Sequence, residues 1–135
     1  MNRSMVGRSD NLVRSWAILA GVVLILTGLL GFIQNPIAYS SNAILIVDNV
    51  HNIVHLLTGA LALGIAFGTK GEQQVNAMLG FGILYVGIFV VNLLSPNLFG
   101  LFSVPANTPI HVIHAAVAVV SLGVGYMARS AATAR

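Results

Sequence analysis

Four long apolar stretches constrain the fold of this chain more than any other feature. A helix that crosses a membrane needs about 20 mainly apolar residues. Four segments meet this requirement, namely 13–33, 49–68, 75–94 and 109–128. Only 7% of the 135 residues are charged, whereas soluble domains carry about 25%. The sequence therefore predicts an all-α membrane protein, a four-transmembrane-helix bundle in one domain over residues 1–135, with the lipid bilayer as its surroundings.

The basic residues predict the orientation of these segments. All six lie before or at the start of the first segment, between the second and third, or after the fourth: Arg3, Arg8, Arg14, Lys70, Arg129 and Arg135. Cytoplasmic loops are enriched in Lys and Arg, so we expect both termini in the cytoplasm, and no nucleic-acid partner. A competing interpretation treats the N-terminus as a cleaved leader, but its apolar stretch exceeds the usual 7 to 15 residues.

The two halves of the sequence resemble each other. A proline follows the first and third segments, and His55 and His114 lie 19 and 18 residues after Pro36 and Pro96, respectively. Both halves would enter the membrane from the same side, which is typical of repeats related by an axis along the membrane normal. We therefore predict two tandem helix-pair repeats with pseudo-two-fold symmetry, over residues 13–68 and 75–128.

Polar residues gather at one end of the second and fourth segments. Spacings of three and four residues place side chains on one face of a helix. The aligned residues are Asp48, Asn52 and His55 in the second segment and Asn107, His111 and His114 in the fourth. His51 lies beside this stripe, and Asn92 can reach the same layer from the third segment. Because Asp is a preferred N-cap residue, we expect the second helix to begin near Asp48.

This polar layer has three interpretations. In the first it is structural: the side chains hydrogen-bond one another and the outer loops, and the residues concerned are Asn52, His55, Asn92, Asn107, His111 and His114. In the second it is a metal site, because imidazoles at these spacings can converge on zinc, copper or iron. The candidate metal ligands are Asp48, His51, His55, His111 and His114. In the third, His55 and His114 are axial ligands of haem or chlorophyll.

Other chemistry is not indicated. The absence of cysteine excludes disulfides, thiolate metal sites and covalent haem attachment. No nucleophile–base set, Walker loop or dinucleotide fingerprint is present, so enzymatic activity is not expected. A proton path through the histidines would find no carboxylate in the inner half of the spans. We expect a structural or accessory subunit of a homo-oligomer or larger membrane complex. The alternative is a metal- or tetrapyrrole-binding redox or pigment protein.

The chain also resembles an uncharacterised bacterial family of short four-span membrane proteins, a domain of unknown function. Its members look like two helix pairs, each with an N-x-x-H-type motif at the start of its second helix. Here the first copy is 52–55, followed by Gly59, whereas the second copy has His111 in place of Asn and Ala118 in place of Gly. The resemblance covers residues 13–128. It implies a bacterial inner-membrane protein without an assigned activity.

Overall fold

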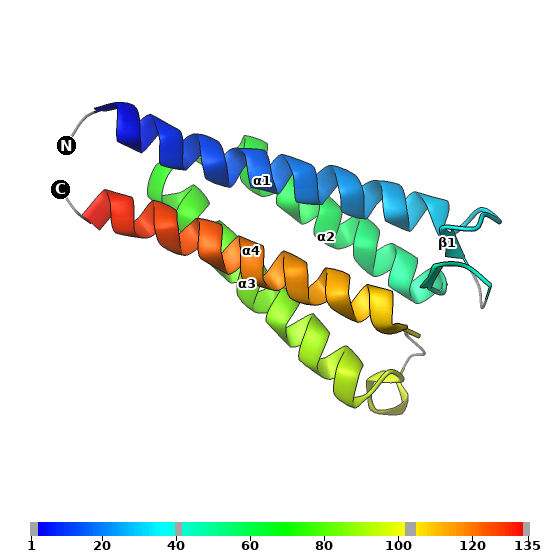
Figure 1. The fold of residues 1–135 in the computed structure, drawn as a ribbon. Helices are drawn as coiled ribbons and strands as arrows, with labels where there is room; N and C mark the ends of the chain where they lie inside the picture. The colour runs from blue at the N-terminus through cyan, green and yellow to red at the C-terminus, as the bar shows by residue number, and fades with distance from the viewer. Residues whose placement is uncertain (1–2, 40–41, 102–104, 134–135) are drawn as a thin grey trace.

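The computed structural model describes residues 3–39, 42–101 and 105–133, with only the backbone for 3–6 and 8–10. These residues form four long helices that run up and down in one bundle (Figure 1). The helices are α1 (Arg3–Leu30), α2 (Asn49–Gly68), α3 (Gly71–Leu94) and α4 (Thr108–Thr133). Each is long and apolar enough to cross a membrane. The predicted all-α, four-helix membrane protein is confirmed, and the chain is a multi-pass membrane protein in contact with the lipid bilayer.

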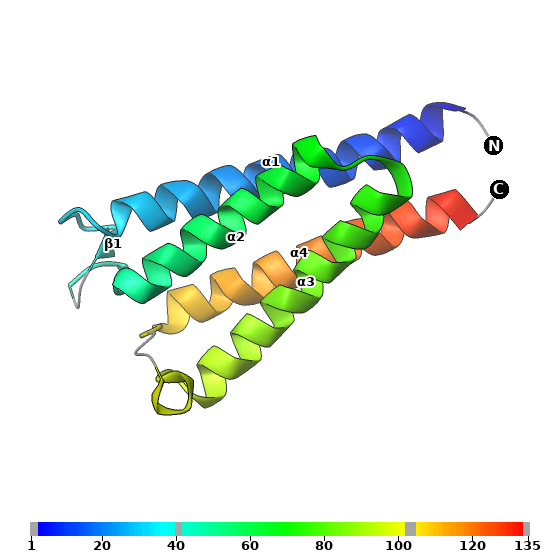
Figure 2. The same cartoon turned by 180° about the vertical axis from the view of Figure 1, so that it is seen from behind.

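The helices pack as two close pairs. α1 packs most extensively on α2, and α3 on α4, while α2 and α3 contact each other little. Figures 1 and 2 show that α2 and α3 diverge toward the end of the bundle opposite the termini. The two pairs match the predicted helix pairs, and the pseudo-two-fold relation between them stays a prediction.

Helices α1 and α2 approach each other closely where two glycines, Gly21 and Gly59, face each other. A Cβ atom added to Gly21 would lie 2.9 Å from the carbonyl oxygen of Gly59, and one added to Gly59 would lie 2.9 Å from that of Gly21. Small residues allow membrane helices to pack backbone against backbone. Gly59 lies one turn after His55 along α2, so this contact also sets the position of the polar end of the helix.

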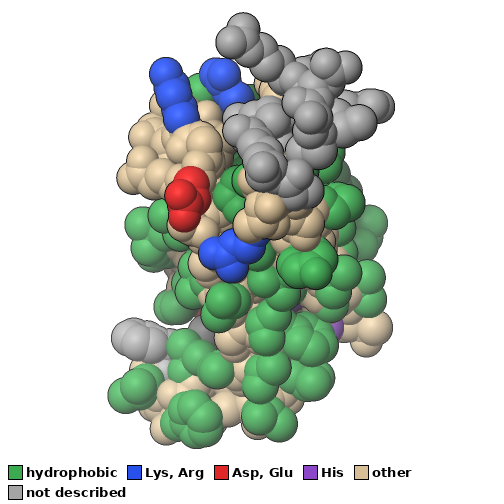
Figure 3. Space-filling model, turned by 90° about the vertical axis from the view of Figure 1, so that its left-hand side faces the viewer, with side chains coloured by type: hydrophobic (Ala, Val, Ile, Leu, Met, Phe, Trp, Pro, Cys, Tyr) green, Lys and Arg blue, Asp and Glu red, His purple; other side chains and the backbone are tan. Residues whose placement is uncertain are grey.

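The lipid-facing surface is apolar and the basic side chains are confined to one end. Large apolar side chains are widely exposed along the helices, as with Leu57 at 65% and Val119 at 69%. The residues with described basic side chains belong to the part of the bundle nearer the two termini: Arg14 lies in the first half of α1, Lys70 directly before α3 and Arg129 near the end of α4. Figure 3 looks onto that end and shows Lys and Arg side chains there. This distribution is that of a bundle with lipid around its sides and polar headgroups at its end.

The end of the α1–α2 pair opposite the termini carries a short parallel ladder that the sequence did not predict (Figure 1). Its strands are β1 (Ala38–Tyr39) and β2 (Leu45–Ile46). The Asn35 side chain accepts the backbone N–H of Ala38 at 2.9 Å and donates to the carbonyl oxygen of Leu30 at 2.7 Å. One amide thus ties the end of α1 to the start of the ladder. The other connection holds a 3-10 turn, η1 (Leu98–Gly100).

The turn between α2 and α3 is held by one buried amide. The Nε2 atom of Gln74 donates to the carbonyl oxygens of Ile65 at 3.0 Å, Ala66 at 3.3 Å and Thr69 at 3.0 Å. Carbonyl groups in the last turn of a helix have no partner within the helix. Gln74 supplies that partner from the next helix, so α3 starts directly after α2.

Replacing Gln74 by Leu should therefore lower the free energy of unfolding by about 1 kcal/mol, because the carbonyl oxygens of Ala66 and Thr69 lose this side-chain donor, whereas that of Ile65 keeps the Thr69 hydroxyl. The measurement is chemical unfolding in detergent, followed by circular dichroism. Gln73→Leu is the matched control, since Gln73 is exposed on the same turn. Equal effects of the two substitutions would contradict this role for Gln74.

Candidate metal centre

Three buried histidines meet at the end of the bundle opposite the two termini (Figure 1). His51 and His55 come from α2 and His114 from α4, and one ring nitrogen from each lies within 4.8 Å of the others. The ring centroids are 4.6 Å apart for His51 and His55, 5.4 Å for His51 and His114, and 6.0 Å for His55 and His114. None of the three side chains is more than 3% exposed. The arrangement is a compact imidazole cluster inside a membrane-spanning bundle.

The start of α2 determines how its two histidines face α4. The carboxylate of Asp48 accepts the backbone N–H of His51 at 2.9 Å and caps the helix, as its N-cap prediction required. Residues four apart lie on the same face of a helix, so His51 and His55 share one face of α2, from which both rings reach that of His114 on α4, across the bundle. The cap therefore fixes the residue at which α2 begins, and with it the face of the helix on which the two histidines lie.

The hydrogen bond of His51 identifies which of its nitrogens is free to bind a ligand. Its Nδ1 lies 2.9 Å from the carbonyl oxygen of Pro105. A carbonyl oxygen only accepts, so Nδ1 carries the hydrogen and Nε2 carries the lone pair. A histidine that binds a metal through one nitrogen usually donates the other N–H to a carbonyl or carboxylate. His51 has this arrangement.

Several buried polar atoms of the cluster have no hydrogen-bond partner in the described part of the chain. They are Nε2 of His51, Nδ1 and Nε2 of His55, Nδ1 of His114 and both amide atoms of Asn52. More than about 90% of buried polar groups in proteins are hydrogen-bonded, and each that is not costs about 1 to 3 kcal/mol. The mutual hydrogen bonds expected of a purely structural layer are not formed by these atoms.

The remaining predicted residues lie outside the three-histidine group. Asp48 serves as the cap of α2. His111 is half-buried, and its ring lies edge-on to that of Phe89, with centroids 6.2 Å apart. The side chain of Asn107 donates to the carbonyl oxygen of Ile44, which lies in the loop before β2. This hydrogen bond ties the start of α4 to that loop. Asn92 is buried on α3.

Two hydroxyl groups form a hydrogen-bonded pair beside the cluster, on the side that faces the termini. The sequence did not predict this pair. The Tyr85 hydroxyl on α3 is 2.9 Å from Oγ1 of Thr58 on α2, and Thr58 donates to the carbonyl oxygen of Val54 at 2.8 Å. The Tyr85 ring is 6.0 Å from that of His114, between centroids. Tyr85 therefore forms an aromatic wall on the side of the histidines that faces the termini. Its position depends on the phase of α3 against α2, which spacing within one helix does not show.

Residues 14–127 match a family described as a domain of unknown function (DUF4383). No curated protein and no solved structure matches the chain. The matched residues include all three histidines of the cluster.

Proposed function

We propose that this chain, which belongs to the family described as a domain of unknown function (DUF4383), binds a divalent transition-metal ion within the membrane through His51, His55 and His114. The observation that supports the proposal is the convergence of three buried imidazoles whose ring nitrogens lie within 4.8 Å of one another. Four of those ring nitrogens have no hydrogen-bond partner in the described chain. A bound ion would satisfy one nitrogen on each ring.

The ligand set favours zinc, copper, nickel or iron. Imidazole suits these ions, whereas magnesium and calcium require oxygen ligands. In a tetrahedral site the metal–nitrogen distance is about 2.0 to 2.1 Å, and ligand nitrogens are then about 3.4 Å apart. The rings therefore have to close by roughly an ångström when the ion binds. With three protein ligands the fourth position is open to water or substrate, as in catalytic zinc sites.

The position of His51 favours a bare ion over a tetrapyrrole. A macrocycle held by His55 and His114 as axial ligands would occupy the space between their rings. The ring of His51 lies 4.6 Å from one and 5.4 Å from the other, between centroids. It would have to leave the cluster to admit haem or chlorophyll, and its hydrogen bond to Pro105 would then break.

The charge distribution supports a definite orientation of this site. The residues with described basic side chains belong to the part of the bundle nearer the two termini, away from the histidines, and basic residues favour the cytoplasmic side. We place both termini in the cytoplasm of a bacterial cell and the histidines near the outer face of its inner membrane. In this setting the protein serves as a metal-binding accessory subunit of a homo-oligomer or a larger membrane complex.

Metal retention tests the proposal. Detergent-purified protein is stripped with a chelator, incubated with Zn²⁺ and desalted, and its metal content is measured by elemental analysis. We expect about one ion per chain in the unaltered protein and in His111→Ala, the matched control, since His111 lies outside the group. His51→Ala and His114→Ala should each retain less than about a tenth of that amount, because two imidazoles do not fill the site.

Two results would contradict metal binding at this site. One is an unaltered protein that retains no Zn²⁺, Cu²⁺, Ni²⁺ or Fe²⁺ under the same conditions. The other is equal loss in His111→Ala and His114→Ala, because the ion would then be held elsewhere. Circular dichroism of each variant separates loss of the site from loss of the fold, and a Soret band in the purified protein would instead support a tetrapyrrole.

A further inference from the structure

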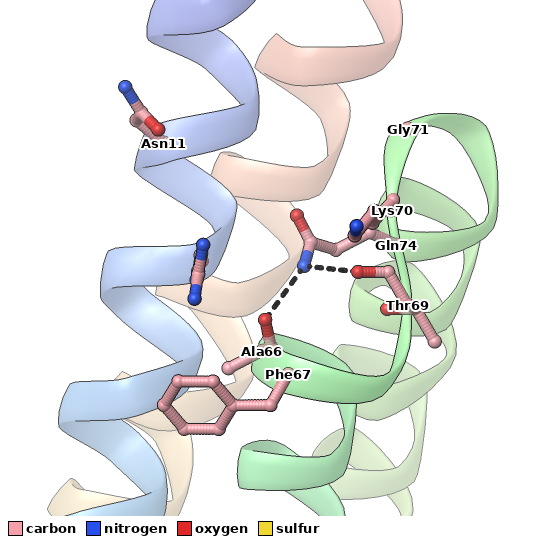
Figure 4. A pocket seen from close by; sticks show the side chains of 8 residues that line it. Asn11, Ala66, Phe67, Thr69, Lys70, Gly71 and Gln74 are labelled. Atoms are coloured by element: carbon pink, nitrogen blue, oxygen red, sulfur yellow. Dashed lines mark hydrogen bonds between the residues drawn. The ribbon is translucent and has the colours of Figure 1, made fainter.

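A polar cavity lies at the end of the bundle opposite the histidines. It has a volume of about 220 Å³, is open on one side, and is lined by α1, the end of α2 and the start of α3 (Figure 4). Among the residues that line it are two cations, Arg14 and Lys70, and the polar side chains of Asn11, Thr69 and Gln74. No described residue of the lining carries a carboxylate, so the charge of the described lining is positive.

Arg14 is held over the cavity by an aromatic ring. Its guanidinium carbon lies 5.3 Å from the centroid of the Phe67 ring, and both side chains line the cavity. A guanidinium over an aromatic face is attracted by the ring, which restricts the long side chain to this position. Its N–H groups therefore remain available to an anion without the full entropic cost of ordering the side chain.

The turn between α2 and α3, which carries Lys70, is held in place by Gln74 and Gly71. The amide nitrogen of Gln74 donates to the carbonyl oxygens of Ala66 and Thr69, and its amide oxygen points away from them (Figure 4). Gly71 has φ of +55°, a conformation that side-chain-bearing residues rarely adopt. The amide and the glycine together hold the turn in one shape. The backbone of Lys70, which lines the same cavity as Arg14, is thus held in one place.

Neither cation is neutralised by a described acidic residue. No ion pair joins Arg14 or Lys70 to a described carboxylate, and Glu72 is exposed and does not line the cavity. The third described cation at this end, Arg129, donates to the side chain of Asn76 at 2.7 Å, outside the cavity. Arg14 and Lys70 therefore converge on one polar space where the membrane-spanning segments end.

We propose that this cavity binds a phosphate group through Arg14 and Lys70. The ligand class is an anion that carries a phosphate, and the headgroup of an anionic phospholipid and free phosphate share this chemistry. Basic pockets between helices at the cytoplasmic side of a membrane protein hold such headgroups. The guanidinium can form paired hydrogen bonds with phosphate oxygens, while the ammonium acts as a point charge.

The test compares lipid and inorganic phosphate on the full chain in detergent. Native mass spectrometry measures retention of added phosphatidylglycerol, with phosphatidylcholine as the lipid without net charge, and a separate titration uses inorganic phosphate. We expect phosphatidylglycerol to be retained preferentially, and the double variant Arg14→Gln, Lys70→Gln to bind it about tenfold or more weakly, since two charges are removed. Arg129→Gln, the matched control at the same end, should bind it within about threefold of the unaltered protein.

A lipid ligand, a soluble phosphate and the absence of a site give different results in this test. Phosphatidylglycerol binding that depends on Arg14 and Lys70 and resists inorganic phosphate supports a lipid headgroup as the ligand. Saturable binding of inorganic phosphate that depends on the same residues supports the site with a soluble ligand. Equal retention of both lipids with no phosphate binding, or equal losses in Arg129→Gln and the double variant, overturns the proposal. The thermal unfolding of each variant, followed by circular dichroism, shows whether the fold is retained.

Discussion

Replacing His55 by Leu is expected to stabilise the metal-free protein and to abolish the stabilisation that zinc gives. Both ring nitrogens of His55 are buried without a hydrogen-bond partner among the described residues, and a buried polar group left in this state costs about 1 to 3 kcal/mol. Leu removes that cost with a side chain of similar size. The free energy of unfolding, measured with a chelator present, should therefore rise by about 1 to 3 kcal/mol.

The zinc response of the same variant completes this test. A ligand that binds only the folded state stabilises it by about 2.7 kcal/mol at one hundred times its dissociation constant. The unaltered protein and His111→Leu should show this gain when Zn²⁺ replaces the chelator, and His55→Leu should not. If His55→Leu instead lowers stability in chelator and zinc changes neither protein, the histidine layer serves packing and not metal binding.

Replacing Gly59 by Leu is expected to have the largest effect on the fold itself. The added side chain would meet the backbone of α1 at Gly21 and the side chain of Ile25, both already close to the position of the missing Cβ. Overpacking of this kind costs about 3 kcal/mol. Chemical unfolding in detergent measures the loss. Because His55 lies one turn away on the same helix, the variant should also bind Zn²⁺ more weakly.

Gly64→Leu is the matched control for this prediction. Gly64 lies on the same helix, and a Cβ atom there would meet nothing within 4 Å. Its substitution should leave the free energy of unfolding within about 0.5 kcal/mol of the unaltered value. If Gly59→Leu and Gly64→Leu unfold alike, the close approach of α1 and α2 does not contribute to stability in the way proposed.

The helices were predictable because the bilayer imposes a length and a composition on them. The apolar run of α2 and the cap at Asp48 together predicted where this helix begins. The apolar pattern could not show that α1 extends back to Arg3, well before the predicted start at residue 13, since that part need not be apolar. The ladder of β1 and β2 has two residues in each strand. It depends on the side chain of Asn35, and short strands of this kind leave no periodic signal.

All three histidines of the cluster are among the five candidate metal ligands predicted from the sequence, but helical spacing could not show which of the five come together. Helical spacing and comparison of the two halves brought His55, His111 and His114 into one layer and placed His51 beside it. In the structure His51 is a member of the buried cluster and His111 packs against Phe89. The difference arises from the rotation of α2 relative to α4, which depends on packing between helices that are distant in sequence.

The central claim, a metal ion bound by His51, His55 and His114, is tested most directly by X-ray absorption at the zinc edge of the loaded protein. We expect three imidazole nitrogens at about 2.0 to 2.1 Å from the ion, with the multiple-scattering pattern of histidine rings. His114→Ala should reduce the number of imidazoles to two, or lose the ion. A first shell of oxygen atoms without imidazole scattering, or an unchanged spectrum in His114→Ala, would contradict the claim.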